Sequence, residues 1–229
     1  MRSPSGRTND GRRLLLFVRL PEKGRVKTRL ARAIGEETAL ALYRCLVADS
    51  LSLARRAGFP TTVFFLPLAC AREVSLGLGK EFPCLPQMGR DLGERMCAAF
   101  RTAFSDAREA VLMGSDVPDL PVPFLNEAFD SLREHEAVIG PALDGGYCLI
   151  GFSSGAFLPA SFSGMEWGGP SVFRSTLDIL KDHGLRVHVL PPWRDVDECT
   201  DLKALLDAHG DLPDGSLATI DFLRRRFRW

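Results

Sequence analysis

Short, uninterrupted apolar runs recur along this chain and are separated by longer amphipathic stretches. The run over 14–18 contains no polar position, which is typical of a strand covered on both faces in a parallel sheet. Similar runs predict further strands over 61–66, 110–113, 137–140, 147–150 and 187–190. Most of the intervals between these runs are long enough for a crossover helix.

Apolar residues at helical spacing predict those crossover helices. In the stretch 36–57, Leu40, Tyr43, Val47 and Leu51 fall at helical spacing, and Gly58 follows as a C-cap. The same reasoning, with acids, hydroxyls or a proline near the start, predicts helices over 91–104, 121–133, 171–182 and 200–208. Because strands and helices alternate, we expect an α/β fold, a three-layer α/β/α sandwich with a mostly parallel (mixed) sheet. In such sheets ligands bind beyond the carboxyl ends of the strands.

Composition favours one well-cored domain. The 229 residues are 45% hydrophobic and 25% charged, and no repeat or low-complexity linker divides them. We therefore expect a single domain over 14–229, preceded by a disordered tail over 1–13. The formal net charge is zero, so the molecule as a whole has no positive electrostatic field that would attract nucleic acid. No apolar run reaches the roughly 20 residues of a membrane span. Six cysteines without metal-ligand spacing, and a start without the apolar core of a signal peptide, predict a cytoplasmic protein with reduced thiols.

Any anion site must therefore be local, and a basic loop follows the first predicted strand. Within seven residues it carries Lys23, Arg25, Lys27 and Arg29, at the point where a strand is followed by a helix. Cations, free backbone amides and a helix N-terminus together form a cradle for polyphosphate. The spacing is that of neither a Walker loop nor a GxGxxG turn, and a solvated basic loop is the alternative interpretation.

Carboxylates follow two other predicted strands. Asp116 lies in the segment 114–118, just after the run 110–113, where an oxygen ligand can hold a hard divalent cation that substrate phosphates share. A helix cap or an Asx-turn is the alternative. A later acidic segment contains Asp195, Asp197 and Asp201. We expect only one of Asp195 and Asp197 to face the pocket, where it would complete a two-carboxylate metal site, and Asp201 to act as a cap.

The loop before the run 147–150 carries groups suited to a substrate. Gly145 and Gly146 permit positive φ angles and close approach of a ligand, while Asp144 offers an acceptor and Tyr147 a stacking face with a hydroxyl. A tight hairpin turn is the structural alternative, and both interpretations can hold together. Trp167, in a glycine-rich loop before a helix, is a candidate lid over the acceptor, with packing against the domain as the alternative.

One segment opens a helix with polar and flexible residues. Gln87, Gly89, Gly93 and Arg95 suit contact with a base or a phosphate, and a capped surface helix is the simpler alternative. The C-terminal segment 217–229 mixes apolar residues with four arginines. This pattern favours packing on the domain itself or on a partner in a homodimer over binding to a membrane surface.

Taken together, five segments resemble the glycosyltransferase-A-type (GT-A) nucleotide-diphospho-sugar transferase superfamily: 17–30, 91–96, 114–118, 144–147 and 195–197. More narrowly, they resemble a bacterial family of small single-domain glycosyltransferases, some linked to arsenosugar biosynthesis and related to phospholactate guanylyltransferase. The resemblance spans residues 14 to about 205, nearly the whole expected domain. The combination is specific, whereas no single segment is.

The resemblance implies a GT-A-like, Rossmann-like fold with a nucleotide over the first half of the sheet and a site divided among three groups of residues. Asp116 would hold Mg²⁺ or Mn²⁺, and similarity to the cytidylyltransferases of isoprenoid synthesis makes Asp197 the second ligand. The candidate nucleotide- and phosphate-binding residues are Arg19, Lys23, Gly24, Lys27, Arg29, Gln87, Gly89, Gly93, Arg95 and Ser115. The candidate substrate-binding residues are Asp144, Gly145, Gly146, Tyr147 and Trp167, and the candidate catalytic residues are Lys27, Asp116 and Asp144.

We therefore expect a metal-dependent transferase, with the reaction left open. In the preferred hypothesis, metal and cations steady the nucleoside diphosphate that leaves a nucleotide-sugar donor while a small-molecule acceptor hydroxyl attacks, with Asp144 as base or sugar-binding group. In the alternative, a nucleotidyltransferase joins a nucleoside triphosphate to a small phosphorylated acceptor and releases pyrophosphate. The first loop lacks the Gly-x-Gly-x-Arg pattern of sugar nucleotidyltransferases, which leaves the nucleotide and the transferred group open. A catalytically degenerate nucleotide-binding module is the third hypothesis.

Overall fold

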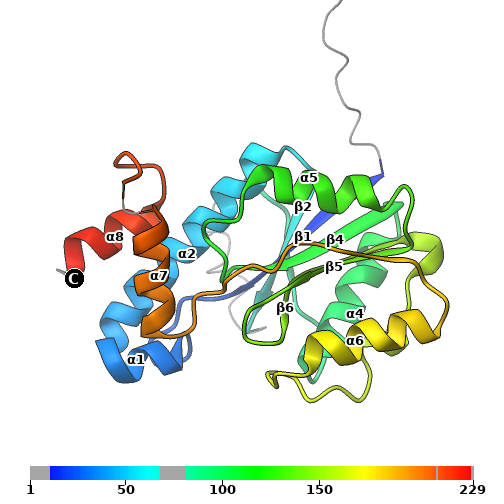
Figure 1. The fold of residues 1–229 in the computed structure, drawn as a ribbon, viewed down its shortest axis with the longest axis horizontal. Helices are drawn as coiled ribbons and strands as arrows, with labels where there is room; N and C mark the ends of the chain where they lie inside the picture. The colour runs from blue at the N-terminus through cyan, green and yellow to red at the C-terminus, as the bar shows by residue number, and fades with distance from the viewer. Residues whose placement is uncertain (1–10, 68–80, 210, 228–229) are drawn as a thin grey trace, which may run out of the picture.

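The computed structural model describes residues 11–67, 81–209 and 211–227, which form a seven-stranded sheet with helices on both faces (Figure 1). The strands are β1 (Arg12–Arg19), β2 (Thr61–Leu66), β3 (Cys84–Pro86), β4 (Glu109–Gly114), β5 (Ala137–Pro141), β6 (Tyr147–Ser153) and β7 (Val187–Val189). Their order in the sheet is β3-β2-β1-β4-β6-β5-β7. β6 is antiparallel to β4 and β5, and the other neighbouring strands are parallel, so the expected mixed, mostly parallel sheet is confirmed.

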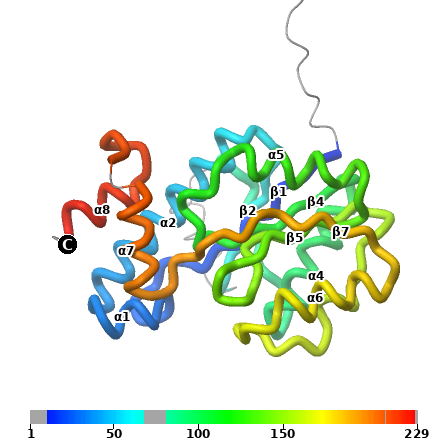
Figure 2. Tube along the Cα trace, in the orientation of Figure 1, coloured from blue at the N-terminus to red at the C-terminus, as the bar shows by residue number. Residues whose placement is uncertain are grey.

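Helices divide between the two faces of the sheet, which gives the three expected layers. They are α1 (Thr28–Ile34), α2 (Glu36–Ala57), α4 (Leu92–Ala103), α5 (Val122–Ser131), α6 (Val172–Asp182), α7 (Cys199–His209) and α8 (Ala218–Arg226), with 3₁₀ turns at Ser154–Ala156 and Pro159–Phe162. One core contains buried residues of α1, α2, α5, α7 and α8, and the other contains those of α4 and α6. The trace in Figure 2 shows α2 and α5 on one side of the strands and α4 and α6 on the other.

The central strand explains why its sequence is apolar at every position. Leu14, Leu16 and Val18 belong to the core beneath α2, while Leu15 and Phe17 belong to the core beneath α4. Successive side chains of a strand point to opposite faces, and both faces are covered here. A continuous apolar run is therefore the pattern that this position requires.

β1 begins two residues earlier than the apolar run indicates. Arg12 is buried, its Nε donates to Glu109 at 2.8 Å, and one of its amino groups donates to Asp130 at 3.0 Å. Because the guanidinium is paired in this way, a charged residue fits inside the strand. Residues 12 and 13 therefore belong to the sheet rather than to the expected tail, and residues 1–10 of that tail lie outside the described residues.

The C-terminal helix packs on its own domain. Ile220 and Leu223 of α8 are buried in the core that α2 shares, and the carboxylate of Asp49 on α2 accepts the N–H groups of Ala218 and Thr219 at 2.8 Å each. The packing interpretation of this segment is confirmed, and residues 228–229 lie outside the described residues. None of the helices in the described part of the chain is long and apolar enough to cross a membrane.

The reversed direction of β6 brings together loops from distant parts of the sequence. β1 and β4 are parallel neighbours, so their carboxyl ends share one edge of the sheet. β6 pairs antiparallel with β4 through Met113 and Leu149, so β6 begins at that same edge. The loops that follow β1 and β4 and the loop that precedes β6 therefore meet there.

Candidate functional site

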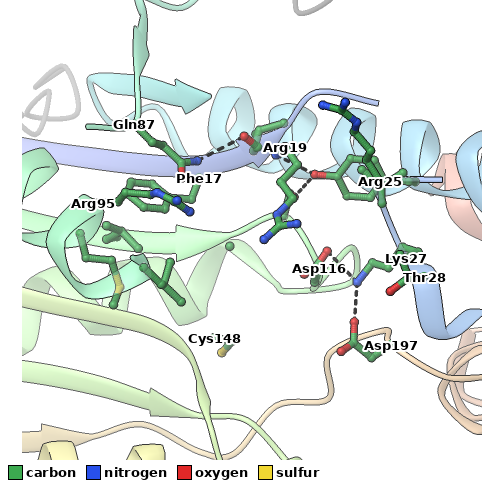
Figure 3. A pocket seen from close by; sticks show the side chains of 18 of the residues that line it. Phe17, Arg19, Arg25, Lys27, Thr28, Gln87, Arg95, Asp116, Cys148 and Asp197 are labelled. Atoms are coloured by element: carbon green, nitrogen blue, oxygen red, sulfur yellow. Dashed lines mark hydrogen bonds and ion pairs between the residues drawn. The ribbon is translucent and has the colours of Figure 1, made fainter. Parts of the chain in front are cut away.

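A buried ammonium group joins two carboxylates at this edge of the sheet. Lys27 Nζ lies 2.8 Å from Asp116 Oδ1 and 2.8 Å from Asp197 Oδ1. Dashed lines in Figure 3 mark both contacts. The Lys27 side chain is 4% exposed, whereas those of Asp116 and Asp197 are 44% and 39% exposed. The three residues come from the loop after β1, the loop after β4 and the segment before α7, so the fold assembles them across most of the chain.

The backbone of Lys27 is held in an unusual conformation. Lys27 is the N-cap of α1 with φ 46° and ψ 48°, and among the described residues it is the only non-glycine residue with positive φ. A left-handed conformation costs a non-glycine residue about 1 kcal/mol and persists where the surroundings determine it. The two ion pairs provide such surroundings, so the backbone turn and the side-chain position of Lys27 belong to one arrangement.

The protonation states of this cluster follow from burial and charge. Burial by itself would lower the pKa of Lys27, but Asp116 and Asp197 outweigh it, and the pKa is raised above its ordinary value of 10.5. Burial would raise the pKa of Asp197, but Lys27 outweighs burial and the pKa is lowered. Lys27 is therefore an ammonium and Asp197 a carboxylate at neutral pH.

Helix α2 fixes the two loops that carry Lys27 and Asp116. The Tyr43 hydroxyl accepts the N–H of Arg19 at 2.9 Å and lies 3.2 Å from Ser115 Oγ. Burial raises the pKa of Tyr43 to about 12, so the phenol stays neutral. The carbonyl of Asp116 also accepts the N–H of Val196 at 2.9 Å, which ties the Asp116 loop to the acidic segment. In the sequence Tyr43 indicates only a core-facing helix position, because its hydroxyl reaches partners 24 and 72 residues away.

The cluster lies on the wall of a pocket of about 520 Å³. One part of this wall is cationic and the other is mostly apolar. The cationic part contains Arg19, Arg25, Lys27 and Arg29, and the mostly apolar part contains Phe17, Val18, Gln87, Leu92, Arg95, Met96 and Leu112. Figure 3 shows the Arg19 side chain pointing into the space above Asp116 and Lys27.

Gln87 and Arg95 line this pocket, and the protein already uses part of their hydrogen-bonding capacity. Gln87 Nε2 donates to the carbonyls of Val18 and Phe64 at 3.3 and 2.9 Å, which joins the ends of β1 and β2. Arg95 Nε donates to the carbonyl of Gly89 at 3.1 Å. Both residues therefore shape the wall of the pocket through the backbone that they hold.

A second pocket, of about 250 Å³, adjoins the first. Residues that line both pockets are Leu92, Gly114, Asp116, Tyr147 and Cys148. The remaining wall of the second pocket includes Asp144, Gly146, Trp167 and Asp195. Asp116 is the charged residue common to both pockets, so it marks the place where ligands in the two would meet.

Both acids of the late segment face the site, and the expectation that only one would do so is wrong. Asp197 lines the larger pocket and Asp195 the smaller one. That expectation treated the two as projecting to opposite sides, whereas residues two apart in an extended segment project to the same side. Burial, Asp144 and Asp197 raise the pKa of Asp195 to about 6. Asp201 is a cap, as expected, because its carboxylate accepts the N–H groups of Asp197 and Glu198.

The aromatic residues of the smaller pocket pack on the domain as well as lining the cavity. The ring of Tyr147 lines both pockets, but its hydroxyl lies 3.8 Å from Met96 Sδ, inside the core. Trp167 contacts Tyr147 edge-on with ring centroids 6.4 Å apart. The stacking face expected of Tyr147 is present, whereas burial removes its hydroxyl from the cavity and raises its pKa.

Five candidates line neither pocket. Lys23 pairs with Glu37 at 2.6 Å on the exposed surface, and Gly24 beside it has a φ of 74°. Gly89 has a φ of 143° in the turn before α4. Gly93 and Gly145 allow protein segments to approach closely, because a Cβ atom would lie 2.2 Å from the carbonyl of Phe162 at the first and 2.1 Å from that of Pro170 at the second.

The donor set at Asp116 and Asp197 fits a hard divalent cation. Each carboxylate directs Oδ1 to Lys27, which leaves the two Oδ2 atoms, and Asp197 Oδ2 lies 3.8 Å from the guanidinium of Arg29. Among the described residues, no group of three or more His, Cys, Asp or Glu side chains could hold a metal ion. Mg²⁺ is commonly held by one or two carboxylates together with water and substrate phosphates, so the chemistry of this pair is compatible with such a site.

Comparison with known proteins places the chain among bacterial proteins of one family. No curated protein matches it. The family described as "Uncharacterized protein conserved in bacteria (DUF2064)" matches residues 47–169. A crystal structure from Desulfovibrio desulfuricans, described as a "putative nucleotide-diphospho-sugar transferase", is 37% identical, covers 94% of this chain and 95% of its own, and has a TM-score of 0.90.

More distant structures share the fold. The manganese complex of Rv0371C from Mycobacterium tuberculosis is 19% identical, covers 87% of this chain and 99% of its own, and has a TM-score of 0.52. The 4-diphosphocytidyl-2C-methyl-D-erythritol synthase of Anaerococcus prevotii is 9% identical, with coverage of 87% and 99% and a TM-score of 0.58. The expected nucleotide-diphospho-sugar transferase fold is therefore confirmed. From the family match over 47–169 and the near-complete similarity to the D. desulfuricans protein, the chain belongs to the bacterial DUF2064 family of nucleotide-diphospho-sugar transferase-like proteins.

Proposed function

We propose that this protein transfers a sugar from a nucleotide-diphospho-sugar to a hydroxyl acceptor, with Mg²⁺ or Mn²⁺ bound at Asp116 and Asp197. The observation that carries the proposal is the cluster of Lys27 with these two carboxylates, placed where a larger cationic pocket meets a smaller one. Two connected pockets suit a donor and an acceptor. The charged residue at their junction, Asp116, suits the place where the diphosphate leaves.

The larger pocket matches a nucleotide-sugar in both volume and polarity. Its volume of about 520 Å³ lies within the range of small-molecule sites. The apolar part beside Phe17, Leu92 and Met96 would receive the base, and the cationic part beside Arg19 and Lys27 would receive the diphosphate. In this proposal Lys27 and Arg29 would bind the phosphates.

The chemistry of the step is the departure of a diphosphate. A divalent cation, when bound, supplies a fixed positive charge that stabilises the negative charge developing on the leaving group. Asp116 and Asp197 would hold that cation. Lys27 and Arg19 would donate hydrogen bonds to the phosphate oxygens as the bond from the anomeric carbon to the diphosphate oxygen breaks.

The acceptor would bind in the smaller pocket and attack from there. Asp144 is the candidate base and sugar-binding group on this side. Its Oδ1 accepts the N–H of Gly146 at 2.8 Å, which fixes the carboxylate, and no other hydrogen bond to it is found within the described part of the chain. The free Oδ2 would accept the proton of the attacking hydroxyl while the hydroxyl oxygen forms the new glycosidic bond.

Nucleotidyl transfer to a phosphorylated acceptor is the second candidate. It is favoured by the four cations in the cationic part of the larger pocket, Arg19, Arg25, Lys27 and Arg29, which would suit a triphosphate as well as a diphosphate. The two reactions differ in what the larger pocket binds and in whether pyrophosphate is released.

A thermal-shift screen separates these candidates. Purified protein is tested against UDP-, GDP-, CDP- and ADP-linked sugars and the nucleoside triphosphates, with and without Mg²⁺ or Mn²⁺. Metal-dependent stabilisation by nucleotide-sugars supports glycosyl transfer, and stabilisation by triphosphates alone supports nucleotidyl transfer. The shift should be lost in Asp116→Asn and kept in Asp178→Asn, which removes an exposed carboxylate of α6 outside both pockets. No shift with any nucleotide would refute both and leave a module without nucleotide chemistry.

A further inference from the structure

The two connected pockets differ sharply in charge. The larger one is lined by Arg19, Arg25, Lys27, Arg29 and Arg95 in addition to its two carboxylates. Among the described residues, the smaller one is lined by three carboxylates and by no lysine, arginine or histidine. The border between the two charge environments passes through Asp116, which lines both pockets.

Two carboxylates of the smaller pocket form no ion pair with the described residues. Within residues 11–67, 81–209 and 211–227, neither Asp144 nor Asp195 forms an ion pair within 4.0 Å, in contrast to Asp116 and Asp197, which share Lys27. An ionised carboxylate is purely a hydrogen-bond acceptor. The free oxygens of this pocket therefore suit ligand groups that donate hydrogen bonds, such as hydroxyl or ammonium groups.

A fixed aromatic surface completes the wall. Trp167 lines the pocket and contacts Tyr147 edge-on, with an interplanar angle of 83°. Gly93 allows this position, because a Cβ atom there would lie 2.7 Å from Trp167 Cζ2. Val172 and Ala142 also line the pocket. A ligand ring with C–H groups on one face and hydroxyls around its edge could stack on the aromatic surface and donate hydrogen bonds to the carboxylates.

We infer that the smaller pocket takes a hydroxyl-rich acceptor without a phosphate or carboxylate group, a neutral or amino sugar being the matching class. This inference rests on the proposed function, since it names the acceptor for that reaction. A phosphorylated compound would place its charge beside Asp144 and Asp195, which have no ion-pair partner among the described residues, and juxtaposed like charges disfavour binding. The pocket therefore also argues against the phosphorylated acceptor that nucleotidyl transfer requires.

The test compares three probes that differ in charge: glucose, glucosamine and glucose 6-phosphate. Their affinities for the full-length protein are measured by ligand-observed NMR, with and without the nucleotide that stabilises it. We expect glucosamine and glucose to bind and glucose 6-phosphate to bind at least about tenfold more weakly than glucosamine, the ratio that 1.4 kcal/mol of charge repulsion gives. In Asp144→Asn/Asp195→Asn this discrimination should fall to about twofold or less, whereas Asp178→Asn should keep it.

Three results would overturn the inference. They are binding of glucose 6-phosphate as tight as that of glucosamine, a discrimination that survives in Asp144→Asn/Asp195→Asn, and failure of all three probes to bind. A thermal shift with nucleotide, measured on the same samples, separates this failure from that of the proposed function. If nucleotide binds but the three sugars do not show the expected order of affinity, only the inference about the acceptor is refuted. If no nucleotide binds, the proposed function itself is refuted.

Discussion

Replacing Lys27 by Met removes the ammonium and keeps most of the aliphatic stem. Loss of one partner from a fully buried ion pair costs about 3–5 kcal/mol, whereas exposed pairs contribute about 1 kcal/mol or less. Here the Lys27 side chain is 4% exposed, but its partners Asp116 and Asp197 are 44% and 39% exposed and remain partly hydrated. We therefore expect Lys27→Met to lower the free energy of unfolding by about 2 kcal/mol, measured by urea denaturation in EDTA.

Divalent cations should reverse much of this loss. Without the ammonium, the Oδ1 atoms of Asp116 and Asp197 also become available to a metal. A ligand at one hundred times its Kd stabilises the folded state by about 2.7 kcal/mol. Mn²⁺ should therefore stabilise Lys27→Met more than the parent protein, in which Lys27 competes for the same carboxylates. Lys23→Met, which removes an exposed lysine paired with Glu37, is the matched control and should change neither quantity.

The pH dependence has a definite sign. The pKa of Lys27 is raised in the folded state, so its stabilisation is complete below the ordinary value of 10.5 and is lost only as the pH rises through the raised value. The difference in stability between Lys27→Met and the parent protein should therefore stay constant from neutral pH up to about pH 10. A variant as stable as the parent in EDTA, or equal stabilisation of both by Mn²⁺, would refute the reasoning.

Other parts of the structure give three further predictions. Asp49→Ala leaves the N–H groups of Ala218 and Thr219 without their acceptor, so the protein should lose about 2 kcal/mol and α8 should become sensitive to limited proteolysis; an unchanged digestion pattern would contradict this role. Gly93→Ala places a methyl group against the Phe162 carbonyl and Trp167, which should lower the free energy of unfolding by about 2 kcal/mol and shift the tryptophan fluorescence. Ala98→Gly in the same helix is the control and should leave the emission unchanged. Tyr43→Phe removes the hydroxyl that joins Arg19 to Ser115, so urea denaturation should show a free energy of unfolding lower by about 1 kcal/mol, and calorimetry should show a weaker affinity for nucleotide. An unaltered affinity would show that the loops after β1 and β4 keep their positions without this hydroxyl.

Elements with a strong local pattern could be predicted from the sequence. The predicted ranges 36–57 and 61–66 have the bounds of α2 and β2, because the buried residues of α2 recur at helical spacing up to the cap at Gly58 and β2 is an almost continuously buried run. β3 has three residues at the edge of the sheet and none is fully buried, so it leaves no apolar run. α1 has seven residues and begins at a left-handed lysine rather than at a capping side chain, so it carries no start signal.

The same limit applies to the candidate site. Lys27 and Asp116 could be selected because each follows a strand at the binding edge of the sheet, whereas only the resemblance to the cytidylyltransferases distinguished Asp197 from Asp195. The contact that joins Lys27 to Asp197 could not be predicted from the sequence, since the two residues are 170 positions apart and only the fold brings them together. Gly93 and Gly145 show the converse limit, because a glycine needed for close packing of protein segments looks in sequence like one needed for a ligand.

Because β6 runs antiparallel to β4, different loops build the two pockets, and each pocket can change in evolution without the other. The larger pocket is built mainly by the loops after β1 and β4 and by α4, whereas the smaller one depends on the turn between β5 and β6 and on the segment before α6. Surface loops accept insertions and exchanges more readily than the strands that they connect. Related proteins with this fold could therefore acquire new acceptors through changes in the β5–β6 turn and in the segment before α6. The pocket proposed for the nucleotide-sugar donor would stay unchanged.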